Sequence, residues 1–154
     1  MASILVVCTA NICRSPVGEG FIRQRLAKTG LVDWDVLSAG TWAAHVRPAA
    51  QYSQEVMADI YGIDISGHQA KMVTAELIEE ADLVLCMARN HVEGLSLEFR
   101  EHTEKIFRLS EMIGELFDIA DPYGQTRPRY ERMAEQVWGI IDEGWDEIIK
   151  RAGK

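Results

Sequence analysis

The feature that most limits the possible folds of this chain is the alternation of short apolar runs with longer segments of helical periodicity. This order is typical of βαβ units, in which helices bury both faces of a parallel sheet. We therefore predict an α/β fold, a single-domain three-layer sandwich over residues 1–154 with a four-stranded parallel sheet flanked by helices. The strands are expected at about 4–8, 34–38, 82–87 and 105–108, and the helices at about 16–29, 49–61, 74–81, 90–97 and 128–151.

Composition excludes several classes of function. The 154 residues and 47% hydrophobic content are enough for one sizeable core. A net charge of −8 disfavours nucleic acid as a partner, because polyanion binding needs clustered cations. No apolar run is long enough for membrane insertion. The three cysteines, an odd number without a disulfide-framework spacing, indicate a reducing compartment. We expect a cytoplasmic monomer.

The segment from Cys8 to Pro16 lies between the first predicted strand and the first predicted helix. Pro16 suits the first helical position, and Ser15 is then expected to be the N-cap. Ligands of open parallel sheets bind beyond the carboxyl ends of the strands, where this segment begins. Successive backbone N–H groups of such a loop, together with the helix N-terminus, form a cradle for a tetrahedral dianion. We therefore predict a phosphate-binding loop after strand 1.

The side chains of this loop predict nucleophilic chemistry. The helix N-terminus, the Arg14 guanidinium and the Ser15 hydroxyl all favour the thiolate of Cys8, which makes it a candidate nucleophile. Arg14 can hold two phosphate oxygens in a bidentate geometry that lysine cannot match. Asn11 is a candidate for a positive φ or for side-chain bonds that brace the loop. The expected phosphate-binding residues are Thr9, Ala10, Asn11, Ile12, Cys13, Arg14 and Ser15.

The spacing of Cys8 and Arg14 is weak when taken alone. Three cysteines and eleven arginines would give a Cys followed six residues later by Arg by chance roughly one time in five. The surrounding strand, the Ser-Pro pair and the helix make the pattern specific. The alternative interpretation is a buried, inert Cys8 with Arg14 on a solvated helix face, to which we give roughly one chance in ten.

Five segments along nearly the whole chain resemble the ordered motifs of the low-molecular-weight protein tyrosine phosphatases. The resemblance implies a cysteinyl-phosphate intermediate, hydrolysis of phosphotyrosine in proteins and small aryl phosphates, and neither a metal nor an organic cofactor. His45, His91 and His102 also lack metal-ligand spacing. A phosphotyrosine-containing protein is the expected partner, with a tyrosine kinase as one candidate. The segments are Cys8 to Pro16, Ser38 to Thr41, His68 to Lys71, Leu85 to Met87 and Asp121 to Gly124.

The resemblance also assigns residues outside the loop. Asp121, in Asp-Pro-Tyr-Gly, matches the general acid, although Asp-Pro alone is an ordinary turn signal. The same carboxyl group could activate water in the second half-reaction. Ser38 and His68 match positions that support the loop through hydrogen bonds with its Asn and Ser. Tyr123 and Ile12 are expected as walls for a substrate ring, and Trp42 is an equally balanced candidate for another wall.

Three departures from the family pattern stand out. Ala10 occupies a position that is usually Gly, so a positive φ there would cost on the order of 1 kcal/mol and loosen the loop. Ala44 replaces an expected aromatic residue. Residues 49–53 lack the acidic and basic pair that is often present there. These differences leave the rate and the substrate preference open.

Other activities are also compatible with this scaffold. Arsenate reductases need further cysteines, and only Cys86 is available beyond the loop. Protein-arginine phosphatases are closer relatives, but they carry Thr at the position of Ile12, and Ile is typical of the tyrosine-specific branch. A catalytically weak phosphate-binding interaction protein is suggested by Ala10 alone. Finally, Cys13 could form a disulfide with an oxidised Cys8, or could simply be a small buried residue.

Overall fold

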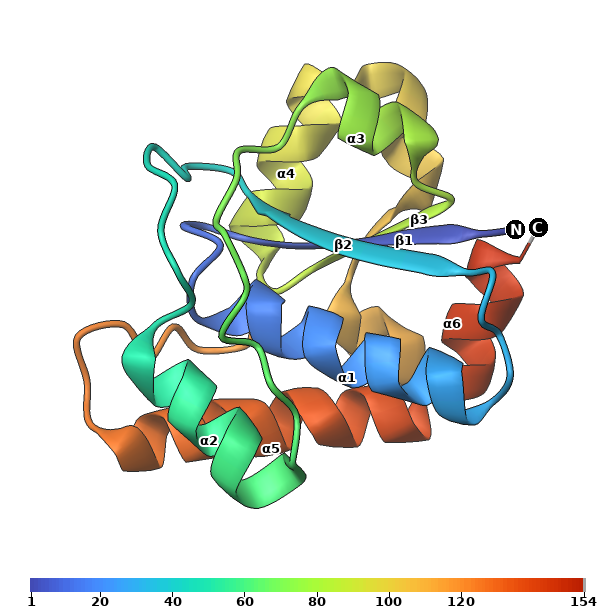
Figure 1. Cartoon of the computed structure of the whole chain (residues 1–154). Coiled ribbons are helices and arrows are strands. Elements are labelled where there is room, and N and C mark those ends of the chain that lie inside the picture. Colours follow the sequence, from blue (N-terminus) through green and yellow to red (C-terminus); the bar gives the residue numbers. More distant parts are fainter. Residues whose placement is uncertain (154) are drawn as a thin grey trace.

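The computed structural model describes residues 1–153 and contains a four-stranded parallel sheet with helices on both faces (Figure 1). The strands lie in the order β2-β1-β3-β4, which confirms the predicted fold class. The strands are β1 (Ser3–Cys8), β2 (Asp35–Gly40), β3 (Leu83–Cys86) and β4 (Ile106–Arg108). The helices are α1 (Arg14–Lys28), α2 (Gln51–Tyr61), α3 (Ala75–Glu80), α4 (Arg89–Glu98), α5 (Arg127–Glu143) and α6 (Trp145–Ala152), with two 3₁₀ segments, η1 (Arg100–Lys105) and η2 (Leu109–Ile113).

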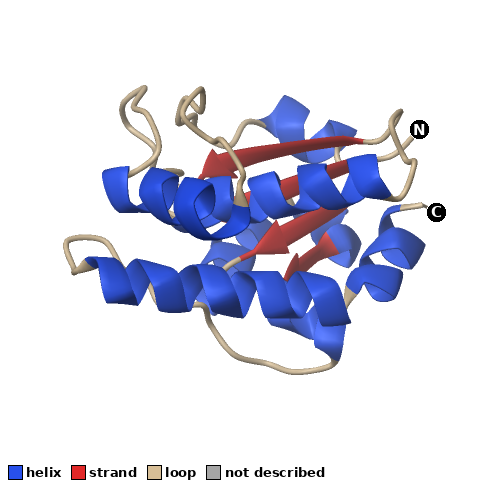
Figure 2. Ribbon diagram, turned by 60° about the horizontal axis from the view of Figure 1, so that its bottom comes forward, coloured by secondary structure: helices blue, strands red, loops and turns tan. Residues whose placement is uncertain are grey.

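Strand β1 is buried on both faces. Because side chains alternate along a strand, Ile4 and Val6 face the core beneath α1 and α5, and Leu5 and Val7 face the core beneath α3 and α4. All four side chains are at most 1% exposed. Figure 2 shows the strands between the two helical layers. A strand without a solvent face explains why its sequence is continuously apolar.

The order of the strands makes the end of β1 the expected position of a ligand site. Residues 3–8 of β1 pair with 35–40 of β2 on one side, and residues 4–7 pair with 83–86 of β3 on the other. The chain runs from β1 outward to β2 and then crosses to β3, so the direction of winding reverses at β1. Such a reversal opens a crevice beyond the carboxyl ends of the strands. Cys8 is the last residue of β1.

Helix α1 begins earlier than the sequence indicates. Arg14 is its first residue, and Cys13 is the flanking residue without a side-chain cap. The prediction that Ser15 caps this helix is therefore wrong. The Ser15 hydroxyl instead contacts the Cys8 sulfur and the Asn11 amide, so the side chain is used by the loop. Pro16 remains within the first turn, where a missing N–H group removes no intrahelical bond.

The single helix predicted over residues 128–151 is two helices, α5 and α6, which meet at Gly144. The helical stripe continues across the break, which is why the sequence pattern does not reveal it. A Cβ atom on Gly144 would lie 2.8 Å from the Met112 carbonyl oxygen of η2. Close packing against η2 thus accounts for the glycine. Among residues 1–153, no helix has both the length and the apolar character needed to cross a membrane.

We predict opposite effects of adding a methyl group at two glycines near the C-terminus. Gly144→Ala should lower the free energy of unfolding by about 1–3 kcal/mol, because η2 or α5 must move. Gly139→Ala is the matched control, since nothing lies within 4 Å of a Cβ atom there and alanine favours the helix, so a gain of up to about 1 kcal/mol is expected. Urea unfolding measures both, and equal effects would contradict this account.

Candidate active site

The loop after β1 folds back so that its two ends meet. The Cys8 sulfur lies 2.9 Å from the Ser15 hydroxyl oxygen, although seven positions separate the residues. Cys8 is 2% exposed and Ser15 is fully buried. The hydroxyl oxygen also accepts a hydrogen bond of 2.8 Å from the Asn11 amide nitrogen. Its own hydrogen therefore remains available to donate to the sulfur.

Asn11 organises the loop through both its backbone and its side chain. Its φ of 60° is the only positive value at a non-glycine residue among residues 1–153. The backbone N–H of Lys71 donates to the amide oxygen at 2.9 Å, and this fixes the orientation of the amide. The amide nitrogen then faces the hydroxyl groups of Ser15 and Ser38, at 2.8 and 2.9 Å.

Two further side chains extend this network away from the loop. His68, which is half-buried, donates from Nε2 to the backbone carbonyl oxygen of Asn11 at 2.7 Å. The Ser38 hydroxyl donates in turn to the Glu19 carboxylate on α1. The loop is therefore supported from three parts of the chain: Ser38 on β2, Glu19 on α1, and His68 in the segment that follows α2. Neither residue touches the sulfur in this arrangement.

The strain expected at Ala10 is absent. Since Asn11 alone among the described non-glycine residues has a positive φ, Ala10 adopts a conformation that suits alanine, and the expectation of a loosened loop on this ground is wrong. The glycine that the loop does require is Gly40. A Cβ atom there would lie 2.3 Å from the Thr9 carbonyl oxygen. The end of β2 can approach the loop only because this residue lacks a side chain.

Arg14 is a buried cation with three contacts through its two terminal nitrogens and none through Nε. It is 5% exposed. Its Nη1 donates to the carbonyl oxygen of Ile119 at 2.8 Å, and its Nη2 donates to the Thr9 hydroxyl at 3.3 Å and lies 3.6 Å from Asp121 Oδ2. Its Nε, also buried, has no hydrogen-bond partner among residues 1–153. A buried guanidinium N–H group without a partner points to an anion that completes the site.

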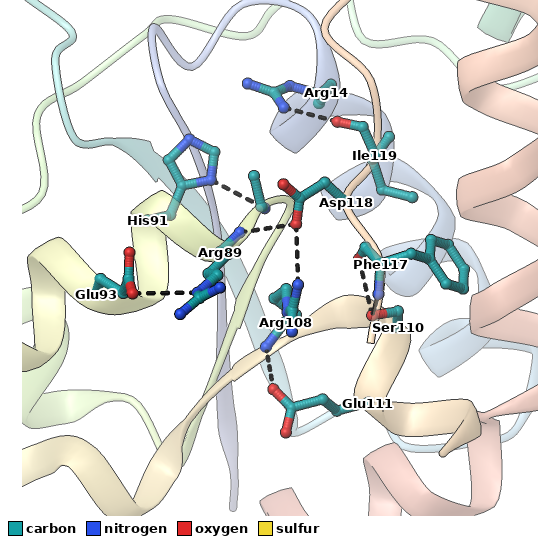
Figure 3. A network of polar contacts seen from close by, with 11 residues as sticks. Arg14, Arg89, His91, Glu93, Arg108, Ser110, Glu111, Phe117, Asp118 and Ile119 are labelled. Atoms are coloured by element: carbon teal, nitrogen blue, oxygen red, sulfur yellow. Dashed lines mark hydrogen bonds and ion pairs between the residues drawn. The ribbon is translucent and has the colours of Figure 1, made fainter. Parts of the chain in front are cut away.

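The segment that carries Asp121 is fixed at several points over the ends of β3 and β4. Asp118 accepts hydrogen bonds from the Arg89 backbone N–H, at 2.9 Å, and from the Arg108 guanidinium, at 3.2 Å (Figure 3). The Ile119 N–H donates to the Met87 carbonyl oxygen at 2.8 Å. Asp121 itself remains about half exposed, with its carboxylate directed to Arg14. The Asp121 carboxylate is thus accessible from solvent, while the segment that carries it is held by hydrogen bonds.

A cavity of about 420 Å³ lies above the loop. Trp42 and Tyr123 lie at its rim with 73% and 58% of their surface exposed, whereas Ile12, at 2%, lies in its floor. Trp42 is held near the loop because its backbone N–H donates to the Thr9 carbonyl oxygen at 2.9 Å. The structure therefore brings every predicted wall residue to one cavity. Other residues that line the cavity include Cys8, Thr9, Ala10, Cys13, Arg14 and Asp121.

The other two thiols have surroundings that suppress ionisation. Burial raises the pKa of the Cys13 thiol to about 11, although a 3.6 Å contact with the Tyr130 hydroxyl acts in the opposite direction. Burial also raises the pKa of Cys86 far above its usual value. Cys86 packs in the core beneath α3 and α4, whereas Cys8 packs in the core on the other face of the sheet.

Sequence reasoning missed three residues that the structure connects to the site. Glu19 lies four residues after Ser15 on the same face of α1, and this spacing could have revealed it. Asp118 and His91 reach the site through tertiary contacts alone, so no local signal identifies them. Within residues 1–153, no group of three or more His, Cys, Asp or Glu side chains is placed to hold a metal ion.

The sequence matches one known protein family over almost its whole length. The family described as "Low molecular weight phosphotyrosine protein phosphatase" matches residues 3–150. The chain belongs to this family. Its members include a probable low molecular weight protein-tyrosine-phosphatase EpsP from Ralstonia nicotianae, 39% identical over 151 residues, which cover 98% of each chain.

Two other members of the family extend the comparison. The crystal structure of a low molecular weight protein tyrosine phosphatase from T. tengcongensis has a TM-score of 0.91 at 39% identity, with 96% of this chain and 99% of that one covered. A protein-arginine-phosphatase from Bacillus subtilis is 33% identical over 142 residues, which cover 87% of this chain and 93% of that one. The family thus contains enzymes named for two different phosphorylated residues.

Substitutions at Asn11 separate its two contributions to the loop. Asn11→Gly keeps the positive φ and removes the amide, so a loss of about 2–3 kcal/mol in unfolding free energy is expected from the buried hydrogen bonds. Asn11→Ala also strains the backbone and should cost about 1 kcal/mol more. Denaturant unfolding measures the difference, and equal stability of the two variants would refute the backbone contribution.

Proposed function

We propose that this protein hydrolyses phosphotyrosine in proteins and small aryl phosphates through a cysteinyl-phosphate intermediate. The observation that carries the proposal is the buried Arg14 Nε without a partner, in the same cavity as Cys8. A dianionic phosphoryl group fits this position, since Arg14 can add a second bond from its fork and the loop N–H groups can bind the remaining oxygens. The expected phosphate contacts therefore include Arg14 and the loop from Thr9 to Ser15.

The first half-reaction transfers the phosphoryl group to sulfur. The Cys8 thiolate attacks phosphorus, so that a phosphorus–sulfur bond forms as the phosphorus–oxygen bond to the phenol breaks. Asp121, in its acid form, donates a proton to the leaving phenolate oxygen. Arg14 stabilises the charge on the equatorial oxygens of the transition state. The partial exposure of Asp121 at the cavity mouth supports its contact with a leaving group.

The second half-reaction restores the enzyme. The Asp121 carboxylate removes a proton from water as the water oxygen attacks phosphorus, and the phosphorus–sulfur bond breaks to release inorganic phosphate. Cys8 then returns to the thiolate form, to which the Ser15 hydroxyl can donate at 2.9 Å. Asn11, Ser38 and His68 have supporting roles in this mechanism, because they orient Ser15 and the loop. One carboxyl group thus serves both steps.

The cavity favours an aromatic leaving group. Trp42 and Tyr123 offer apolar surfaces at the rim, and Ile12 offers one in the floor. Ile12 is the residue typical of tyrosine-specific members, and this argues against the arginine phosphatase alternative. The arsenate reductase alternative is weaker still, because the thiol of Cys86 is fully buried and lies beneath the opposite face of the sheet from Cys8. The alternative of a catalytically weak phosphate-binding protein is also disfavoured, because it rested on backbone strain at Ala10, and Ala10 has no positive φ.

The wider setting belongs to the same proposal. We infer that residues 1–154 form a single domain of this family and that the protein acts as a cytoplasmic monomer on a phosphotyrosine-containing protein, with a tyrosine kinase as one candidate. The described structure supports the domain assignment through one continuous sheet. Residue 154 lies outside the described part of the chain. No cofactor is needed by the reaction as written.

Three substitutions test the assigned roles. Cys8→Ser should abolish turnover, because an alcohol replaces the thiolate. Arg14→Lys should raise KM and lower kcat, since a lysine cannot make the bidentate contact. Asp121→Asn should slow substrates with poor leaving groups by about 10²–10⁴-fold and leave better ones less affected. Steady-state assays with aryl phosphates of graded leaving-group pKa measure all three, and normal turnover by Cys8→Ser would overturn the mechanism.

A comparison of substrates tests the specificity. We expect kcat/KM for a phosphotyrosine peptide to exceed that for a phosphoarginine peptide of the same sequence. Arsenate reduction should be undetectable. Trp42→Ala should lower kcat/KM for the tyrosine substrate about threefold to tenfold through lost apolar contact. A preference for phosphoarginine would assign the protein to the other branch.

We also propose that Cys13 protects Cys8 from over-oxidation. Peroxide would convert the Cys8 thiolate to a sulfenic acid, and Cys13 would then form a disulfide with it as water leaves. Because the pKa of Cys13 is about 11, disulfide formation should become faster as the pH rises towards that value. Peroxide-treated wild type should regain activity with dithiothreitol, and Cys13→Ala should recover less. Equal recovery by the two proteins would disprove the role of Cys13.

A further inference from the structure

His91 is a buried titratable residue that the proposed reaction does not use. It belongs to the first turn of α4, and only 1% of its surface is exposed. Its Nδ1 lies 3.1 Å from the backbone nitrogen of Ala88, and its Nε2 lies 2.9 Å from the hydroxyl oxygen of Thr9 in the phosphate-binding loop. The ring thus joins α4 to the loop across 82 positions of sequence.

The backbone contact determines which nitrogen carries the proton. A backbone N–H group can only donate, so Nδ1 accepts from Ala88 and Nε2 bears the hydrogen of the neutral ring. Burial lowers the pKa of His91 to about 4, and the charge of Arg14 adds to this effect against weaker opposite effects of Asp118 and Asp121. At neutral pH, His91 therefore donates from Nε2 to the Thr9 hydroxyl.

The Thr9 hydroxyl receives a second donor on its other side. Arg14 Nη2 lies 3.3 Å from the same oxygen, so both acceptor positions of the hydroxyl are used. The hydrogen of that hydroxyl is then free to turn into the cavity, which Thr9 helps to line. The same two donors fix the position of the oxygen against which one arm of the Arg14 fork rests.

We propose that His91 is a positioning residue that acts through Thr9 on the phosphate-binding site. It holds the Thr9 oxygen as an acceptor for Arg14, so that the guanidinium keeps the orientation needed to bind phosphate, and it directs the Thr9 hydroxyl hydrogen towards the bound anion. This inference rests on the proposed phosphate chemistry of the cavity. Arg14 is also fixed by Ile119 on its other arm, so His91 tunes the fork (Figure 3).

Arg89, two residues before His91, gives the first turn of α4 a second contact with the site. The backbone N–H of Arg89 donates to Asp118 at 2.9 Å, in the segment that carries Asp121 (Figure 3). One turn of helix therefore touches both halves of the site, with His91 on the loop and Arg89 on the acid segment.

The test is a double-mutant cycle on phosphate binding. His91→Leu removes the donor, and Thr9→Val removes the hydroxyl at nearly constant shape. Each single variant should weaken the binding of inorganic phosphate, measured by titration calorimetry, about threefold to tenfold. Because both act through one hydrogen bond, the double variant should bind no more than about twofold more weakly than the weaker single variant. Effects that multiply would overturn the proposal.

Two further variants separate positioning from stability. His91→Gln places an amide donor near the position of Nε2, so phosphate affinity should return to within about threefold of the wild type. His102→Leu, a histidine on η1 outside the site, is the matched control and should leave phosphate affinity unchanged. If His91→Leu fails to fold, His91→Met, which also lacks a donor, replaces it in the cycle with Thr9→Val.

The outcomes also distinguish this inference from the proposed function. A loss of thermal stability by His91→Leu with unchanged phosphate affinity would show that the residue is only structural. Binding of phosphate by the wild type without hydrolysis of any aryl phosphate would refute the proposed function, while the cycle on affinity would still decide the role of His91. Absence of phosphate binding by the wild type would overturn both.

Discussion

The side-chain amide of Asn11 makes the contacts on which the conformation of the loop after β1 depends. Its oxygen is occupied by the Lys71 N–H, and this leaves its nitrogen for the two serine hydroxyls. Each hydroxyl, having accepted a bond from the amide, has its hydrogen free for another acceptor. Ser15 can therefore donate to the Cys8 sulfur, and Ser38 donates to the Glu19 carboxylate. The Lys71 N–H group thus sets the orientation of the amide, and the amide in turn sets the direction in which both serine hydroxyls donate.

The burial of Arg14 gives an acidic protein a local positive charge. With a net charge of −8, the chain as a whole repels phosphate, so attraction must be local. A guanidinium that is 5% exposed retains most of its field because little water screens it. Its contacts with Ile119, Thr9 and Asp121 satisfy part of its hydrogen-bonding capacity, while Nε remains without a partner. The hydrogen-bonding capacity of this buried cation is therefore only partly used by the residues around it.

Much of the fold followed from the sequence because apolar periodicity reflects burial directly. The four strands and the order of the helices depend on such local patterns. The break at Gly144 was not predicted because the apolar stripe continues through it. The glycine is required by the close approach of the Met112 carbonyl group of η2. The Ser15 hydroxyl likewise has two competing uses, and only the folded loop shows that the sulfur, not the helix end, receives it. Patterns in one segment cannot reveal partners that come from another.

The three cysteines show how surroundings separate chemically identical groups. Cys86 lies in the core beneath one face of the sheet, where burial opposes ionisation. Cys13 shares the loop with Cys8, yet its neighbour is the Tyr130 hydroxyl, and its pKa is raised to about 11. Cys8 ends β1 and lies 2.9 Å from the hydroxyl oxygen of Ser15, whose hydrogen is free to donate. The same thiol group is thus opposed in its ionisation by burial at Cys13 and Cys86, whereas at Cys8 it faces a hydroxyl donor, so the folded surroundings and not the residue type make the three cysteines different.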